Sequence, residues 1–313
     1  MTHSKILDEL YSSIYALNME GGWHRKAPAL WPSPRENFLP YLWRYEDVKP
    51  ILAVAGDLVD HSMADRRNLT MTNPVPGNPY STLRTLVAAY QSIKPGEIAH
   101  SHRHTPNALR IILEGRGTYT VVNGTQIEMC PGDVLLTPSW CWHAHGNDGQ
   151  DECIWVDVLD VPLVHLLEPM FFEHHPDKLE RDVREVQTDP LAFKWEDSVR
   201  LLAVASAPEH GMAEREIELG TPALKTAAVH IQAMSQGFVS STHRTTANAV
   251  FTVLAGTGTT RSGETLMTWK KGDVFAVPAW RPYQHTIESD AHLVRVSDEP
   301  VMRAFDLLRT AGN

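Results

Sequence analysis

The sequence has few cysteines, no long apolar segment and no run of a single charge, and each absence narrows what the protein can be. Its three cysteines are Cys130, Cys141 and Cys153, an odd number without the spacing of a metal-binding or redox pair. We therefore expect reduced thiols in a cytoplasmic protein rather than a disulfide framework. No apolar stretch approaches the roughly 20 residues that cross a bilayer, and the N-terminus lacks a secretory signal pattern, so we expect no membrane contact.

Charge and size exclude further classes of protein. The formal net charge is −10, and no cluster of lysine and arginine is long enough to form a basic patch, so we expect no nucleic-acid partner. With 313 residues, of which 42% are hydrophobic and 21% charged, the chain has an ordinary globular composition and is long enough for two domains. Its 16 histidines are a high number, which fits a metal enzyme without proving one.

Three of these histidines are candidate metal ligands. His102 and His104 are separated by one residue, and alternate residues of a β-strand point to the same face. His143 follows further along the chain, where a neighbouring strand can bring it into the same space. Three neutral imidazoles that leave positions open for a substrate are what a catalytic divalent metal requires. We predict that these three residues hold one metal ion.

The residues around these histidines follow the two-part cupin motif, which places glycine, proline and asparagine at fixed intervals from the ligands. The motif residues in this chain are Gly96, His102, His104, Gly132, Pro138, His143 and Asn147. A histidine pair alone is weak support, because two surface histidines explain it more often than a metal does. The complete set is specific, and it disfavours the alternative that these are unrelated core histidines.

The sequence predicts helices near the N-terminus and strands elsewhere. Apolar residues recur at helical spacing over residues 5–18, and residues 47–59 fit a second helix with Pro50 in its first turn. From about residue 69 onward, short apolar runs alternate with glycine, proline and asparagine turns, which predicts an antiparallel barrel or sandwich. Within it, Asn-Gly at residues 123–124 predicts a type I′ hairpin turn, and residues 163–175 resemble a short helix.

The strand pattern occurs twice in the chain. The segment HRHTPNALRIILEGRGT at residues 102–118 aligns with HRTTANAVFTVLAGTGT at residues 243–259. We therefore predict a mainly β bicupin, with two double-stranded β-helix (jelly-roll) barrels after an N-terminal helical segment. The predicted divisions are an N-terminal helical segment at 1–60, a catalytic cupin barrel at 61–175, a linker at 176–198 and a degenerate structural cupin barrel at 199–313.

The two copies differ at the ligand positions. Thr245 and Tyr283 stand where the first copy has its second and third histidines, and only His243 remains of the ligand set. A single imidazole holds a divalent metal poorly, so we expect metal in the first barrel alone. The alternative is a divergent second site formed by His243, Tyr283 and His285.

The expected ligand set contains no carboxylate. Many cupins carry a glutamate four or five residues after the second histidine, but this chain has Ala108 and Leu109 there. Three neutral ligands leave the metal its full positive charge, which suits a substrate that brings its own anionic groups. A zinc site for hydrolysis would have the same ligands, so the ligand types alone do not separate iron from zinc.

Strand parity nominates five further residues for the pocket. Arg110 faces inward if the strand of the first two histidines continues unbroken, and it would then clamp a substrate carboxylate or form an internal salt bridge. His145 has the parity of the third ligand and could bind or deprotonate a substrate hydroxyl, or support a ligand. Val87, Ala89 and Gln91 share one face of the preceding strand.

With these residues the chain resembles the gentisate 1,2-dioxygenase family of bicupins, which includes salicylate and 1-hydroxy-2-naphthoate dioxygenases. The resemblance covers nearly the whole chain and includes a degenerate C-terminal barrel. It rests on the stretches PYLWRY at residues 40–45, TNP at 72–74, HRHTPNALR at 102–110 and TPSWCWHAHGN at 137–147.

The resemblance implies an extradiol-type non-haem iron dioxygenase with one Fe(II) per chain, bound in the first barrel. Its substrate would be an aromatic 2-hydroxy acid, whose ring opens between the carboxyl-bearing and hydroxyl-bearing carbons while both atoms of O₂ enter the product. In the family, the position of Arg110 contacts the carboxylate, that of His145 the hydroxyl region, and those of Gln91 and Arg67 the pocket. Relatives form homotetramers or dimers, so we expect self-association.

Two positions depart from the pattern of some relatives, which carry tryptophan where this chain has Val87 and glycine where it has Ala89. The smaller valine opens space near the ring, so we favour a ring-substituted salicylate such as 5-nitrosalicylate over gentisate. Two alternatives remain at this point. One is another metal-dependent cupin enzyme, a hydrolase or isomerase, and the other is a non-catalytic bicupin binding protein.

Overall fold

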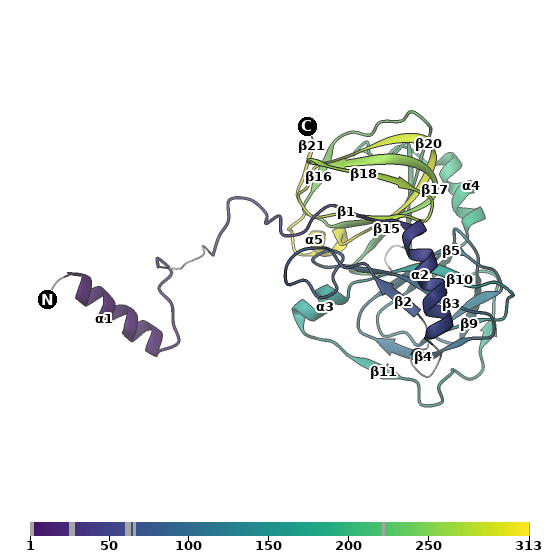
Figure 1. Cartoon of the computed structure of the whole chain (residues 1–313), viewed down its shortest axis with the longest axis horizontal. Coiled ribbons are helices and arrows are strands. Elements are labelled where there is room, and N and C mark those ends of the chain that lie inside the picture. Colours follow the sequence, from purple (N-terminus) through teal and green to yellow (C-terminus); the bar gives the residue numbers. More distant parts are fainter. Residues whose placement is uncertain (1–2, 25–28, 60–63, 65–66, 221–222, 313) are drawn as a thin grey trace. The chain divides into compact units, whose positions relative to one another are not determined.

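The computed structural model describes residues 3–24, 29–59, 64, 67–220 and 223–312, and strands dominate it (Figure 1). The chain divides into a unit of residues 1–35 and a larger unit of residues 36–313. The first unit contains helix α1 (His3–Ala16), which begins and ends two residues earlier than predicted and buries none of its residues. All sheets lie in the larger unit, so the prediction of a mainly β protein is confirmed.

The first half of the larger unit forms two six-stranded sheets. The first sheet has the order β13-β8-β5-β10-β3-β2 and consists of β2 (Arg67–Thr70), β3 (Val87–Ile93), β5 (Ala108–Glu114), β8 (Val134–Thr137), β10 (Cys153–Leu159) and β13 (Ala192–Phe193). The second sheet has the order β11-β4-β9-β6-β7-β12 and consists of β4 (Ile98–His104), β6 (Thr118–Val122), β7 (Thr125–Met129), β9 (His143–Asn147), β11 (Phe172–His174) and β12 (Arg184–Glu185).

The second half forms one nine-stranded sheet, here called the third sheet. Its strands are β1 (Tyr41–Trp43), β14 (Arg215–Leu219), β15 (Ala228–Met234), β16 (His243–Thr245), β17 (Ala249–Ser262), β18 (Thr265–Lys270), β19 (Val274–Val277), β20 (Tyr283–Ser297) and β21 (Thr310–Gly312). β17 and β20 are paired along nearly their whole length, and their register shifts at several bulges. Bulges bend a strand, so these two strands can run through both walls of a barrel as one sheet.

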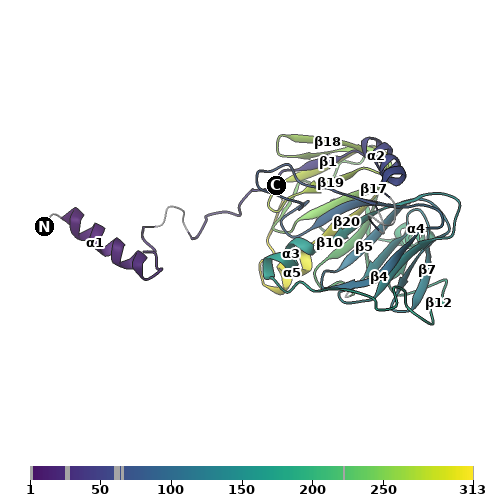
Figure 2. The ribbon, with the colours of Figure 1, turned by 60° about the horizontal axis from the view of Figure 1, so that its bottom comes forward.

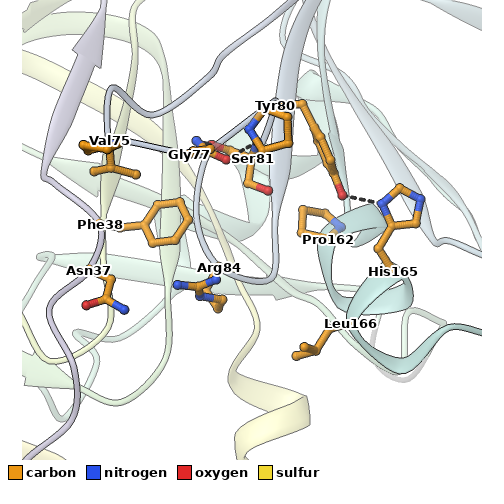
Figure 3. Close-up of a pocket in the computed structure, with 13 residues that line it drawn as sticks. Asn37, Phe38, Val75, Gly77, Tyr80, Ser81, Arg84, Pro162, His165 and Leu166 are labelled. Atoms are coloured by element: carbon orange, nitrogen blue, oxygen red, sulfur yellow. Dashed lines mark hydrogen bonds between the residues drawn. The ribbon is translucent and has the colours of Figure 1, made fainter. Parts of the chain in front are cut away.

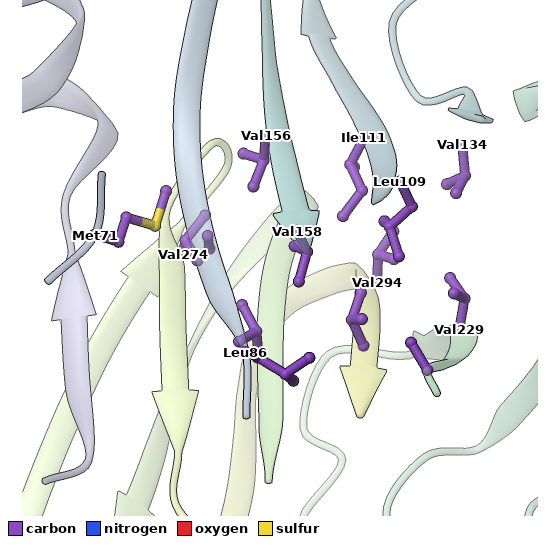
Figure 4. Packing of buried hydrophobic residues seen from close by; sticks show 14 of the residues in the cluster. Met71, Leu86, Leu109, Ile111, Val134, Val156, Val158, Val229, Val274 and Val294 are labelled. Atoms are coloured by element: carbon purple, nitrogen blue, oxygen red, sulfur yellow. The ribbon is translucent and has the colours of Figure 1, made fainter. Parts of the chain in front are cut away.

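The main hydrophobic core lies between the first sheet and the third sheet (Figures 2 and 4). Val156 and Val158 of β10 belong to this core, whereas Trp155, which alternates with them, belongs to a separate cluster on the other face of the sheet. Successive residues of a strand point to opposite faces, so β10 separates two environments. One face of the first sheet packs against the second barrel, and the other faces the interior of the first barrel.

Each barrel gains an edge strand from the segment that precedes the other barrel in the chain. β1 pairs with β19 of the third sheet, and β13 pairs with β8 of the first sheet. The helices that follow are α2 (Tyr45–Leu58) and α4 (Trp195–Val204). The Tyr45 N–H donates to Asp273 Oδ1 and the Trp195 N–H to Asp133 Oδ1, both at 2.8 Å. The division predicted at residues 60, 176 and 198 stays a prediction.

Two glycines of the cupin motif allow this exchange. Gly132 and Gly272 have φ angles of +92° and +89°, which side chains rarely adopt. A Cβ atom on Gly132 would lie 2.6 Å from the ring of Trp195, and one on Gly272 would lie 2.4 Å from the ring of Tyr45. Glycine is therefore required at both positions by the backbone and by the aromatic ring packed on it.

Local sequence signals predicted a turn and a helix correctly, and a second helix only in part. Asn123 and Gly124, with φ angles of +45° and +76°, join β6 and β7, which confirms the predicted type I′ turn. The helix predicted at 47–59 begins two residues earlier and contains Pro50. The helix predicted at 163–175 is wrong in its second half. Helix α3 (Val161–Leu167) ends at Glu168, and residues 172–174 pair with β4 as a strand. The pseudo-equivalent helix of the second barrel is α5 (Glu299–Ala304).

Candidate metal centre

The structure brings the three predicted ligands together inside the first barrel. His102 and His104 lie on β4 and His143 begins β9, directly opposite His102 in the strand register. One ligand atom from each residue lies within 4.8 Å of those of the other two. Side chains of opposite residues in an antiparallel pair project from the same face, so the strand register directs these imidazoles to one face of the sheet.

Backbone carbonyl groups fix which nitrogen of each ring faces the centre. The Nδ1 atoms of His102, His104 and His143 lie 3.0, 2.8 and 3.0 Å from the carbonyl oxygens of His100, Pro106 and Cys141. A carbonyl can only accept, so each Nδ1 carries the proton and each Nε2 presents a lone pair. Metal-ligating histidines typically make such a hydrogen bond through the ring nitrogen that does not bind the metal. This bond sets the tautomer and the ring orientation.

The electrostatics of the centre favour neutral imidazoles. Burial lowers the pKa of His143 well below its usual value, and the positive charge of Arg110 and the neighbouring His102 and His104 lower it further. His143 Nε2 is buried and has no hydrogen-bond partner among the described residues. Three neutral nitrogen donors without a carboxylate therefore fit a divalent transition metal.

Arg110 is deeply buried, but the continuous strand that was expected to connect it with His104 is not present. β4 ends at His104 and a new strand, β5, begins at Ala108 in a different sheet, so no continuous strand carries the parity across. Arg110 is only 1% exposed; its Nη1 donates to Thr137 Oγ1 at 2.7 Å, and its Nε lies 3.5 Å from Asp157 Oδ1. The internal salt bridge that was the alternative to a substrate clamp is thus present.

Asp157 organises a buried polar network inside the first barrel. Its Oδ1 accepts a hydrogen bond from Trp155 Nε1 at 2.8 Å, and its Oδ2 accepts one from Gln91 Nε2 at 2.5 Å, besides the ion pair with Arg110. The strand register places Asp157 directly opposite both Ala89 and Arg110. A single carboxylate in the otherwise apolar strand CIWVDVL was the signal that could have revealed it.

The other predicted pocket residues divide between two faces of the first sheet. Val87, Ala89 and Gln91 alternate along β3 on the face that carries Asp157, and all three are at least nine-tenths buried. Arg67 pairs opposite Ser92 and therefore lies on the other face. Its Nη2 donates to Glu97 Oε1 at 2.6 Å and its Nε to the Val59 carbonyl at 3.0 Å.

His145 lies beside the ligands, two residues beyond His143 on β9. It is fully buried, and its ring centroid is 6.1 Å from that of His143 and 5.6 Å from that of Trp155. Thr120 pairs opposite it on β6. The expected parity of His145 with the third ligand is therefore present in the strand.

The described residues of the second barrel contain no comparable ligand group. His243 pairs opposite Tyr283, and their ring centroids are 5.8 Å apart. Nδ1 of His285 is 2.8 Å from the Thr260 hydroxyl, and complete burial, followed by the charge of Arg295, lowers the pKa of His285 to about 3. Among the residues that the structure describes, the first barrel holds the only group of three close candidate ligands.

A surface cavity of about 540 Å³ lies apart from the three candidate ligands. It is lined by residues 75–81, by Arg84 over the ring of Phe38, and by α3, where the Tyr80 hydroxyl contacts His165 Nδ1 (Figure 3). None of the three candidate ligands lines it.

In the described part of the chain, no helix is long and apolar enough to cross a membrane.

Known proteins resemble this chain in sequence and in structure. The cupin domain family matches residues 89–159, which include the three histidines and Arg110. The 5-aminosalicylate 1,2-dioxygenase of a Comamonas species is 35% identical, over 97% of this chain and 89% of that protein. Gentisate 1,2 dioxygenase 1 of Aquipseudomonas alcaligenes is 32% identical, over 97% of this chain and 96% of that protein.

A solved structure extends the similarity to the complete fold. The crystal structure of a salicylate 1,2-dioxygenase from Pseudaminobacter salicylatoxidans matches with a TM-score of 0.89 and 27% identity, and the match covers 100% of this chain and 99% of that one. A likeness over both barrels confirms the predicted bicupin architecture.

Proposed function

Since this chain belongs to the gentisate and salicylate 1,2-dioxygenase family, we propose that it opens the ring of a substituted salicylate or of gentisate with O₂. The observation that carries the proposal is the group of three histidines, two buried and one partly buried, whose ligand atoms lie within 4.8 Å in a chain with these relatives. The ring would open between the carbons that bear the carboxyl and hydroxyl groups, and both oxygen atoms would enter the product.

We assign one Fe(II) per chain to His102, His104 and His143. Their neutral Nε2 donors and the missing carboxylate match a site that binds an anionic, chelating substrate. When bound, the iron would supply the redox chemistry with O₂ and the positions for the substrate's carboxylate and hydroxyl oxygens. The cleavage is of the extradiol type only in a broad sense, because a salicylate has a single ring hydroxyl.

Arg110 is our candidate for binding the substrate carboxylate. Asp157 and Thr137 hold its guanidinium from two sides, so the group is oriented before any substrate arrives. A planar guanidinium binds a carboxylate through two parallel hydrogen bonds, which fixes the ring of the substrate as well as its charge.

His145 is our candidate for the substrate hydroxyl. It is fully buried next to His143, so it would meet the hydroxyl in a place from which water is excluded. There it would accept the phenolic proton or hold it in a hydrogen bond. Gln91 would contact the substrate. Its Nε2 is engaged by Asp157, and its buried Oε1, which has no hydrogen-bond partner among the described residues, can accept a hydrogen bond. We leave Arg67 out of the substrate site because it lies on the opposite face of the sheet.

A substituted salicylate is the preferred substrate because the pocket wall of β3 is built from small residues. Val87 and Ala89 lie on the same face as Gln91. A relative that is 35% identical is named for 5-aminosalicylate, which is a salicylate with a ring substituent. The relatives favour ring cleavage over the alternatives of a hydrolase, an isomerase or a binding protein.

The first test is O₂ uptake by protein reconstituted with Fe(II) under anaerobic conditions. The substrates are gentisate, salicylate, 5-aminosalicylate, 5-nitrosalicylate, 5-chlorosalicylate and 1-hydroxy-2-naphthoate. Uptake of one O₂ per molecule with loss of aromatic absorbance confirms the reaction and names the substrate. Iron-loaded protein that consumes no O₂ with any of them contradicts the proposal.

The wall of β3 gives a separate prediction about specificity. Val87→Trp fills the space beside the ring, so we expect kcat/KM for 5-substituted salicylates to fall by about 10-fold or more, with unsubstituted salicylate affected less. Val87→Ala preserves the space and serves as the control, which should keep turnover of the bulky substrates. Equal turnover of 5-nitrosalicylate by the tryptophan variant and the parent would contradict this assignment.

Two further properties are proposed, one from the family and one from cysteine usage. We propose that the protein assembles as a homodimer or homotetramer, which light scattering coupled to size-exclusion chromatography measures directly. A monomer over the working range of concentrations would contradict it. The cytoplasmic location expected from cysteine usage stays a prediction, which fractionation of the source cells tests.

A further inference from the structure

Arg103, the residue between the first two ligands, points out of the barrel and is held on three sides. Its guanidinium carbon lies 4.5 Å from the ring centroid of Trp140 and 4.4 Å from that of Trp142. Its Nε and Nη2 donate to Glu173 Oε2 at 2.9 and 2.6 Å. Stacking between two indoles and bonding to a carboxylate restricts this long side chain to one position.

These contacts connect the three segments that surround the metal centre. Arg103 lies on β4 between His102 and His104, and Trp142 immediately precedes His143 of β9. Glu173 lies on β11, whose neighbouring residue Phe172 stacks on the ring of His102 with 5.4 Å between the centroids. The segment that carries the third ligand and the strand that covers the first are thus both attached to the strand between the other two.

The second barrel supplies an internal comparison. Its equivalent arginine, Arg244, also lies over a tryptophan, Trp280, at 5.5 Å. Trp140 and Trp280 even share a left-handed backbone, with φ angles of +66° and +64°, so the turn itself belongs to the fold. Arg244 and one indole are therefore features of a cupin barrel in this chain, whether or not it has metal ligands.

The remaining two contacts exist only around the barrel with the ligands. Pro282 stands at the position of Trp142, directly before Tyr283, and Ala311 pairs opposite Arg244 where Glu173 pairs opposite Arg103. The second indole and the carboxylate are thus absent in the copy whose ligand set has been lost.

We propose that Arg103, with Trp140, Trp142 and Glu173, is a positioning group that sets the three histidines at metal-binding distance before the metal arrives. We call these four residues the outer clamp. The inference rests on the proposed metal site and concerns how that site is held. Without the clamp the two ligand-bearing segments can separate, and binding would have to supply the energy that orders them.

The test compares Arg103→Ala with the matched variant Arg244→Ala in the second barrel. Metal-free protein is titrated with Co(II), followed by its absorption spectrum, and with Fe(II) under anaerobic conditions. We expect Arg103→Ala to weaken both affinities by about 10-fold or more, as for other groups that support metal ligands. Arg244→Ala should bind as the parent does. An exposed ion pair adds little stability, so the melting temperature of metal-free Arg103→Ala should change little.

Two additional variants keep the proposal testable if Arg103→Ala folds poorly. Glu173→Ala copies Ala311, a residue that the second barrel accommodates at this position, and should weaken metal binding in the same direction. Arg103→Lys keeps a cation over the indoles but loses the two-nitrogen contact, so its affinity should be intermediate.

The outcomes separate the clamp from the proposed function. If the parent protein binds no divalent metal, the proposed function fails. If the parent binds metal and Arg103→Ala and Glu173→Ala bind it equally well, the clamp is overturned while the metal site stands. An equal loss in Arg244→Ala would also overturn the clamp, because it would show a general effect on the fold rather than an effect on the ligands.

Discussion

At the scale of single residues, the metal centre depends on carbonyl groups as much as on histidines. Each of the three ligands has its Nδ1 within 3.0 Å of a backbone carbonyl oxygen two residues away in the sequence, so the local chain decides the tautomer. This explains why the set behaves as a unit, since a different backbone path at residues 102–106 would misdirect the lone pairs as well as the rings.

His104→Ala should remove stable metal binding, because two imidazoles hold a divalent ion far more weakly than three. The measurement is the metal content of the protein after equilibrium dialysis against Fe(II) or Co(II). Tyr283→Phe, at the position of a lost ligand in the second barrel, is the control and should retain one metal per chain. A His104→Ala protein with full metal and full activity would refute the site.

Asp157→Ala should destabilise the protein strongly. It leaves the buried Arg110 guanidinium without its counter-ion and also removes the acceptor of Gln91 and Trp155. Breaking one side of a buried ion pair costs about 3–5 kcal/mol. The free energy of unfolding in urea measures this loss.

The double variant Asp157→Ala/Arg110→Met is the control for this network. It removes both charges, so its loss should be smaller than the sum of the two single losses. Strictly additive losses, or a loss below about 1 kcal/mol for Asp157→Ala, would contradict the role assigned to the ion pair.

At the scale of elements, the strands position the site through register and the turns through backbone shape. The β6–β7 hairpin shows both, because Asn123 exchanges two hydrogen bonds with Trp142, the residue before His143. The same turn therefore closes a hairpin and supports the approach to the third ligand. Its sequence signal was local, which is why the turn could be predicted.

Gly124→Ala should reduce stability by about 1 kcal/mol through backbone strain alone. Gly124 has a φ of +76°, and a Cβ atom there would meet nothing within 4 Å, so no clash contributes. Thermal and urea unfolding measure the change. An unchanged midpoint for Gly124→Ala would contradict the strain argument.

At the scale of the whole molecule, the two barrels form one reciprocal structure. The strand before each barrel pairs with a strand of the other one. Two buried aspartates also link the two halves of the chain. Asp160 accepts a hydrogen bond from Thr226 of the second half, and Asp298 accepts one from Thr85 of the first half. Each barrel depends on a strand from outside its own part of the chain to pair with its sheet. We therefore expect the larger unit to unfold cooperatively.

Two truncations test this reciprocity. Removal of residues 1–35, which form their own unit, should leave the unfolding midpoint of the remainder nearly unchanged. Removal of residues 1–58 also deletes β1 and α2, exposing an edge of the third sheet and the apolar surface under Leu52, and should abolish cooperative unfolding. Calorimetry and circular dichroism distinguish the two. A cooperative transition in the shorter protein would show that the second barrel does not need these segments.

Features that arise from short-range order could be predicted from the amino-acid pattern. These are the three histidines, the cupin motif around them, the repeat with its lost ligands, the type I′ turn and the family resemblance. Strand alternation and turn chemistry act over a few residues, so a pattern in the sequence is enough to predict them. The same logic failed for Arg110, because the parity of one strand does not pass through a turn into another sheet.

Which distant groups meet became apparent from the folded chain. The ion pair of Arg110 with Asp157, the placement of Arg67 on the opposite face, the attachment of Trp142 and Glu173 to Arg103, and the exchange of β1 and β13 all depend on pairing between strands far apart in the chain. Register between such strands is fixed by the packing of the whole core, and no local signal encodes it.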